Sequence, residues 1–208
     1  MNNLIFGNQD PQKIGVSIEE KVRSSVAATT PVPYELEEGG LGKTNVATVL
    51  FDVGSVLNGG RTSRLFGYKF TLPAPWPASL HVWVERQGVG AYTGPLLYSA
   101  TFAKPLAAEV GIEGHKSFGT PKFLGDPAVA GKLNAAGDLA KRVDKLLRAE
   151  STMGAITVKA PRTFKLAPEA GGAVLVLGTL PRMTSMGMSA EVDAGEFLAI
   201  AAAIEAAL

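Results

Sequence analysis

The order of apolar periodicities along the chain limits the choice of fold more than any other feature. Apolar residues recur at every second position in residues 65–72, 80–85 and 96–103, as they do in strands. They recur at every third or fourth position in residues 126–147 and again in residues 193–208, as on one face of a helix. Residues 155–159 and 173–180, which lie between these helices, form short apolar runs typical of strands. The order of strands, helix, strands and helix predicts an α+β fold, with a mostly antiparallel sheet and helices packed on one side.

Capping residues define the predicted helices. Asp126 followed by Pro127 is a typical helix start, because the carboxylate can accept from free amides and proline needs no amide partner there. Gly137 predicts a break within this helical region. The spacing of Asp193 and Glu196 is that of a capping box, and it predicts the start of the last helix.

The first part of the chain is predicted to differ from the rest. We expect residues 1–42 to form an N-terminal arm or extension and residues 43–208 to form a single α+β domain. Apolar residues at steps of four in residues 14–26 indicate one helix face. After the arm, an apolar run at residues 46–53 predicts a strand, and Asn-Gly-Gly at residues 58–60 predicts a tight turn. The arm has two interpretations, a loosely packed extension or a segment that docks on a partner.

Composition excludes several classes of function. The chain has no cysteine, which removes disulfides, thiolate catalysis and cysteine-ligated metal sites. Its two histidines leave little for a transition metal, so we expect neither a metal nor another cofactor. A formal net charge of +1 argues against nucleic-acid binding. No apolar stretch reaches the roughly 20 residues of a membrane span, and no signal peptide is visible. We therefore expect a cytoplasmic protein with no membrane contact.

One glycine-rich segment has the spacing of a phosphate-binding loop. Gly114 and Gly119 are separated by four residues, as in such loops. Thr120 and Pro121 follow, where a phosphate loop would have lysine and then serine or threonine. Because proline lacks an amide proton, this segment is not expected to hold a nucleotide.

The same segment resembles a motif of acetoacetate decarboxylase-like proteins. Gly-Thr-Pro-Lys at residues 119–122 is similar to the family's Gly-x-Pro-Lys, which carries a Schiff-base lysine. The resemblance implies that Lys122 is a nucleophile whose pKa burial and nearby cations would lower. Tyr92 matches the start of the family's Tyr-x-Glu segment, but Gly94 stands where the family has the carboxylate. Phe123 stands where the archetypal decarboxylase has a second lysine.

A broader resemblance covers residues 59–208. In these residues the chain is similar to small uncharacterised prokaryotic proteins of unknown function. The shared features are a Gly-Arg hairpin at Arg61, a Phe-Leu-Gly-Asp segment at residues 123–126 that opens a helix, and a terminal helix after Asp193. This resemblance implies the order of elements and no particular activity.

Two groups of residues are candidates for binding. His81 and Trp83 share one face of a predicted strand, while Arg61 and Arg64 lie beside the predicted turn. Together they could bind a small anionic or planar ligand. The alternative is that the strand face is an ordinary solvent-side or interface face of the sheet and that both arginines are simply solvated.

A methionine-rich loop and the last helix are candidates for protein contacts. Met183, Met186 and Met188 would form an adaptable apolar surface if exposed, or would otherwise fold over the core. The alanine-rich residues 197–208 leave little bulk between packed helices. Our leading hypothesis is therefore a non-catalytic structural or protein-interaction domain that forms a homo-oligomer or binds a protein partner. The alternatives are a decarboxylase-like or aldolase-like enzyme using Lys122, and a binder of small anionic ligands.

Overall fold

The computed structural model describes residues 32–37, 64–87, 90–113, 120–147, 150–153, 156–159, 163–179, 182–184, 187–189 and 193–208. The strands are β1 (Val32–Glu37), β2 (Arg64–Thr71), β3 (Ala78–Gln87), β4 (Gly90–Phe102), β5 (Val110–Glu113), β6 (Lys122–Gly125), β7 (Glu150–Met153), β8 (Ile156–Lys159), β9 (Thr163–Glu169), β10 (Gly172–Thr179), β11 (Arg182–Thr184) and β12 (Gly187–Ser189). The helices are α3 (Pro127–Ala135), α4 (Leu139–Leu147) and α5 (Ala194–Ala207).

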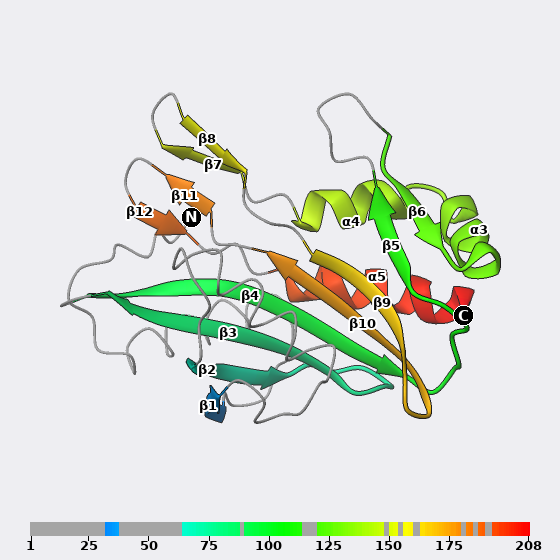
Figure 1. Ribbon diagram of the computed structural model, residues 1–208, viewed down its shortest axis with the longest axis horizontal. Helices are drawn as coiled ribbons and strands as arrows, with labels where there is room; N and C mark the ends of the chain where they lie inside the picture. Colours follow the sequence, from blue (N-terminus) through cyan, green and yellow to red (C-terminus); the bar gives the residue numbers. More distant parts are fainter. Residues whose placement is uncertain are drawn as a thin grey trace.

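Eight of these strands form one sheet in the order β1-β2-β3-β4-β10-β9-β5-β6 (Figure 1). All of its described strand pairs are antiparallel. Strands β1 to β4 follow one another as a meander, and the β9–β10 hairpin then lies between β4 and β5. Strands β7 and β8 form a separate two-stranded sheet, as do β11 and β12. The sheet is therefore completed by a segment far along the chain from the meander.

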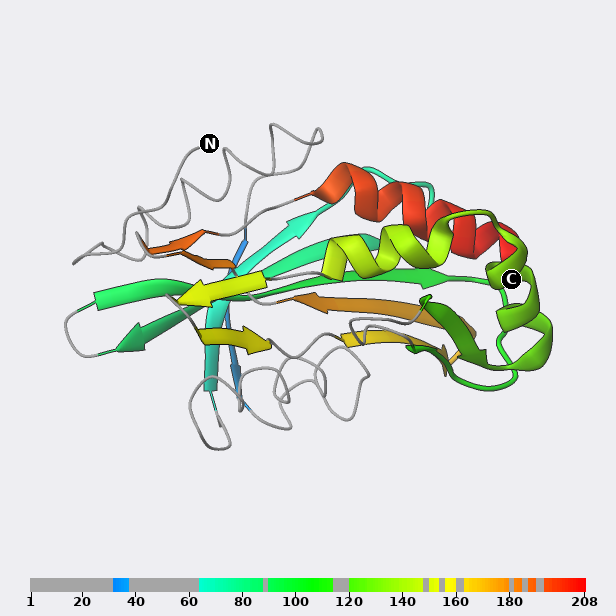
Figure 2. The ribbon, with the colours of Figure 1, turned by 90° about the horizontal axis from the view of Figure 1, so that it is seen from above.

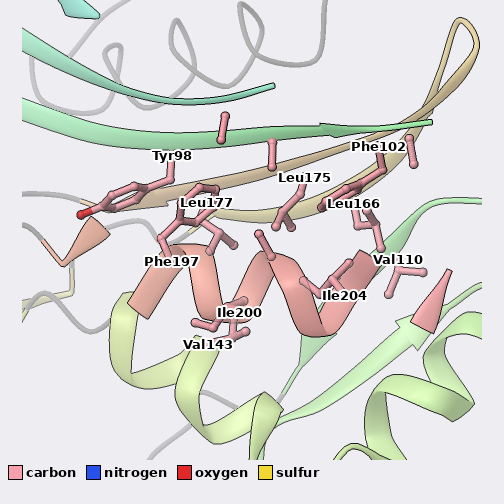
Figure 3. Close-up of a cluster of buried hydrophobic side chains, with 14 of the residues drawn as sticks. Tyr98, Phe102, Val110, Val143, Leu166, Leu175, Leu177, Phe197, Ile200 and Ile204 are labelled. Carbon is pink, nitrogen blue, oxygen red and sulfur yellow. The ribbon is translucent and has the colours of Figure 1, made fainter. Parts of the chain in front are cut away.

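Of the described helices, α4 and α5 lie side by side over one face of this sheet, and α3 packs beside β6 at the end of the sheet (Figure 2). Side chains from both layers form one buried cluster, shown in part in Figure 3. The ring of Tyr98 on β4 stacks on Phe197 of α5 with centroids 5.0 Å apart. The Tyr98 hydroxyl accepts a hydrogen bond from the backbone N–H of Asp193, immediately before α5. These contacts confirm the predicted α+β fold with a mostly antiparallel sheet and helices on one side.

Alternation along the strands divides the side chains between two faces. Leu80 on β3 pairs with Tyr98 on β4, and both belong to the cluster beneath the helices. The neighbouring pair, His81 and Leu97, points to the opposite face, which we call the second face. The second face is also buried at its centre. Its buried residues are Ser79, His81, Leu97, Ser99, Ala167, Val174 and Val176.

The helix ends largely follow the predicted caps. The Asp126 carboxylate accepts hydrogen bonds from the first free amides of α3, and Gly137 takes a positive φ of 63° between α3 and α4. Asp193 caps α5 by accepting from the N–H of Glu196. The predicted capping box is wrong in its second half. Both carboxylate oxygens of Glu196 accept hydrogen bonds from Arg142 on α4 instead.

The β6 edge of the sheet is closed by a side chain. Strand β6 is the last in the sheet order. Asn134 of α3 accepts a hydrogen bond from the Phe123 N–H at 2.8 Å and donates one to the Phe123 carbonyl at 2.9 Å. Its amide therefore occupies the backbone groups with which another strand would pair. We call this pair of hydrogen bonds the Asn134 clamp.

The predicted arm is only partly described. Residues 32–37, which belong to the predicted arm, form β1 and pair with β2. The predicted helix at residues 14–26, strand at residues 46–53 and turn at residues 58–60 lie outside the described residues. The division at residue 42 stays a prediction. Of the helices that the structure describes, none has the length and apolar character needed to cross a membrane.

Candidate functional site

The most concentrated polar chemistry on the sheet lies at the centre of the second face. Ser79 and His81 are two residues apart on β3 and therefore share this face, while the register of β3 and β4 places Ser99 opposite Ser79. The Ser79 Oγ lies 3.1 Å from His81 Nε2 and 2.8 Å from Ser99 Oγ. We call these three residues the Ser–His–Ser cluster. It is a continuous chain of hydrogen-bonding groups across two strands.

The His81 ring is held neutral by its surroundings. Burial lowers the pKa of His81, and the positive charge of Lys69, its cross-strand partner on β2, lowers it further, from 6.5 to about 4. The ring therefore carries no charge at neutral pH. His81 is buried, so its side chain is not on a solvated face, whereas its predicted role in binding a ligand stays a prediction.

The Ser79–His81 distance is that of a nucleophile and its base, so nucleophilic catalysis has to be considered. Two observations weigh against it. A base with a pKa of about 4 is a weak proton acceptor at neutral pH. Ser79, His81 and Ser99 are also only 8%, 8% and 7% exposed, which leaves a substrate little access. The geometry therefore fits a buried polar network better than an active site. Among the described residues, no group of three or more acidic or histidine side chains is arranged to hold a metal ion.

Two of the other predicted ligand residues, Arg64 and Trp83, can be placed by strand register. Arg64 begins β2, and its register partner on β1 is Glu37. The register partner of His81 on β2 is Lys69 and not Arg64. Trp83 pairs with Gly67 of β2, and the register of β3 against β4 shifts just beyond Val82. Arg61 lies outside the described residues. The hypothesis of an anionic-ligand site stays a prediction.

Lys122 lies at the start of β6 with an exposed side chain. Its register partner on β5 is Glu113, which is exposed too. A Schiff-base lysine depends on burial and neighbouring cations to keep its amine neutral. The position of Lys122 supplies no such burial. The glycine-rich residues 114–119 before it lie outside the described residues.

The outward surface of α5 is uniform and uncharged. Ala199, Ala202 and Ala206 are all exposed and recur at steps of three and four residues, so they share one side of the helix. We call these three residues the alanine face. Its charged neighbours, Glu196 and Glu205, are held at the flanks of the helix.

Salt bridges fix both glutamates of α5. Arg142 Nε lies 2.7 Å from Glu196 Oε1, and Lys104 Nζ lies 3.4 Å from Glu205 Oε1. Lys104 also donates to the Glu205 carbonyl, and Lys132 of α3 donates to the Ala207 carbonyl. These bonds satisfy backbone groups at the end of the helix and tie it to two other parts of the chain.

The methionine-rich loop is described in part. Met183 on β11 and Met188 on β12 stand opposite each other in a short hairpin, while Met186 lies outside the described residues. Strand β11 contacts β7, so this hairpin adjoins the other small sheet.

No family model matches the chain, and neither a curated protein nor a solved structure matches it. Sequence reasoning singled out His81 but missed Ser79 and Ser99. The position of Ser79 could have been predicted from the sequence, because residues two apart on a strand lie on the same face and Ser79 is two residues before His81. The position of Ser99 could not, since its place opposite Ser79 depends on the register of two strands.

Proposed function

We propose that the chain is a non-catalytic interaction domain that associates with a second copy of itself through α5. The observation that supports this is the alanine face of Ala199, Ala202 and Ala206. Alanine side chains let two helix backbones come close together, because interaxial distance depends on the side chains at the contact. Close approach gives many dispersion contacts, and alanine loses no side-chain entropy when it is buried.

Charge supports the same proposal. The two acidic side chains of α5 are engaged by Arg142 and Lys104, so a second helix can approach without leaving either carboxylate unpaired. The chain as a whole carries a formal net charge of only +1, so two copies repel each other weakly. The Ser–His–Ser cluster is buried and Lys122 is exposed, and neither arrangement favours catalysis.

Light scattering on the purified chain over a wide concentration range tests the proposal. We expect a mass that rises from one copy to two, and a strict monomer at high concentration would refute it. Replacing Ala202 with glutamate would place an unpaired charge in the contact, which costs several kcal/mol when buried. Association of the A202E variant should therefore weaken at least tenfold.

The matched control is the same change at another exposed helical alanine. Ala135 is the last residue of α3 and is exposed, so Ala135→Glu adds the same charge away from the alanine face. Its association should equal that of the unmodified chain. If A135E and A202E weaken association equally, net charge rather than the alanine face controls it, and α5 is not the contact.

A further inference from the structure

We draw no further inference here: the strongest candidate, the apolar centre of the second face around Leu97, Val174 and Val176, is buried, but no element among the residues that the structure describes shows what covers it.

Discussion

Removing the Asn134 clamp should destabilise the protein and open one edge of its sheet. Asn134→Ala deletes both side-chain hydrogen bonds to Phe123, which span 2.8 Å and 2.9 Å. Each hydrogen bond contributes about 1 kcal/mol net, so the pair contributes about 2 kcal/mol. Alanine forms helix more readily than asparagine by about 0.6 kcal/mol, and water can reach the vacated groups because Asn134 is exposed. We therefore expect the free energy of unfolding to fall by about 1–2 kcal/mol.

Equilibrium unfolding in urea measures this loss through the transition midpoint, provided that the slope is unchanged. A matched variant separates the two hydrogen bonds. Asn134→Asp keeps an oxygen to accept from the Phe123 N–H, but it has no donor and turns a carboxylate oxygen toward the Phe123 carbonyl. It should be at least as destabilising as one lost bond. An alanine variant as stable as the unmodified chain would refute the reasoning, because the clamp would then contribute nothing.

The clamp also predicts a change in solubility. With Asn134 replaced by alanine, the outer backbone groups of Phe123 become available to another strand. Light scattering of the alanine variant at elevated temperature should rise earlier than that of the aspartate variant. The negative charge of aspartate discourages edge pairing even though it weakens the clamp.

Three further outcomes follow from particular contacts. A Cβ added at Gly172 would clash with the backbone oxygen of Phe102, so Gly172→Ala should lower the free energy of unfolding in urea by about 1–3 kcal/mol. An unchanged transition midpoint would contradict this packing. The hydrogen bond from Arg142 lowers the pKa of Glu196 below its ordinary 4.5, so the ion pair stabilises the fold above that pH and is lost as the pH falls through the folded-state value. Glu196→Gln should therefore cost at most about 1 kcal/mol at pH 7, and the cost should vanish in acid. Borohydride treatment with β-keto acids should leave no mass adduct on the exposed Lys122, and an adduct there would revive the Schiff-base hypothesis.

The sequence predicted the helices and strands whose buried side chains recur at a regular spacing along the chain. Helix α5 was expected from its apolar spacing, and Phe197, Ile200 and Ile204 are fully buried as that spacing requires. The break between α3 and α4 was expected from Gly137, which takes the left-handed conformation that glycine favours. Strands β5, β6, β7, β9, β11 and β12 were missed. Several have only three or four residues, too few for a period to appear.

The burial of the candidate site was harder to predict than the strand face on which its residues lie. Alternation along the strand predicted that His81 and Leu80 point to opposite faces of the sheet, and the structure agrees. Alternation does not say whether the second face is buried. It also does not say which strands stand beside β3 and β4 in the sheet. Strand β10 stands next to β4 although it lies far along the chain, and no local pattern indicates such a neighbour. Val176 of β10 is the cross-strand partner of Ser99 and extends the buried region.

The insertion of the β9–β10 hairpin beside β4 has a consequence for folding during synthesis. The meander of β1 to β4 is made first, and hairpins such as β9–β10 can form quickly from neighbouring residues. The pairing of β4 with β10 must close a long loop, so it should be a late and slow step. Until then, the edge of β4 and apolar residues such as Leu97 and Tyr98 stay available to other chains. A nascent chain paused before residue 172 should therefore be the species most prone to aggregate, and the one that gains most from a chaperone.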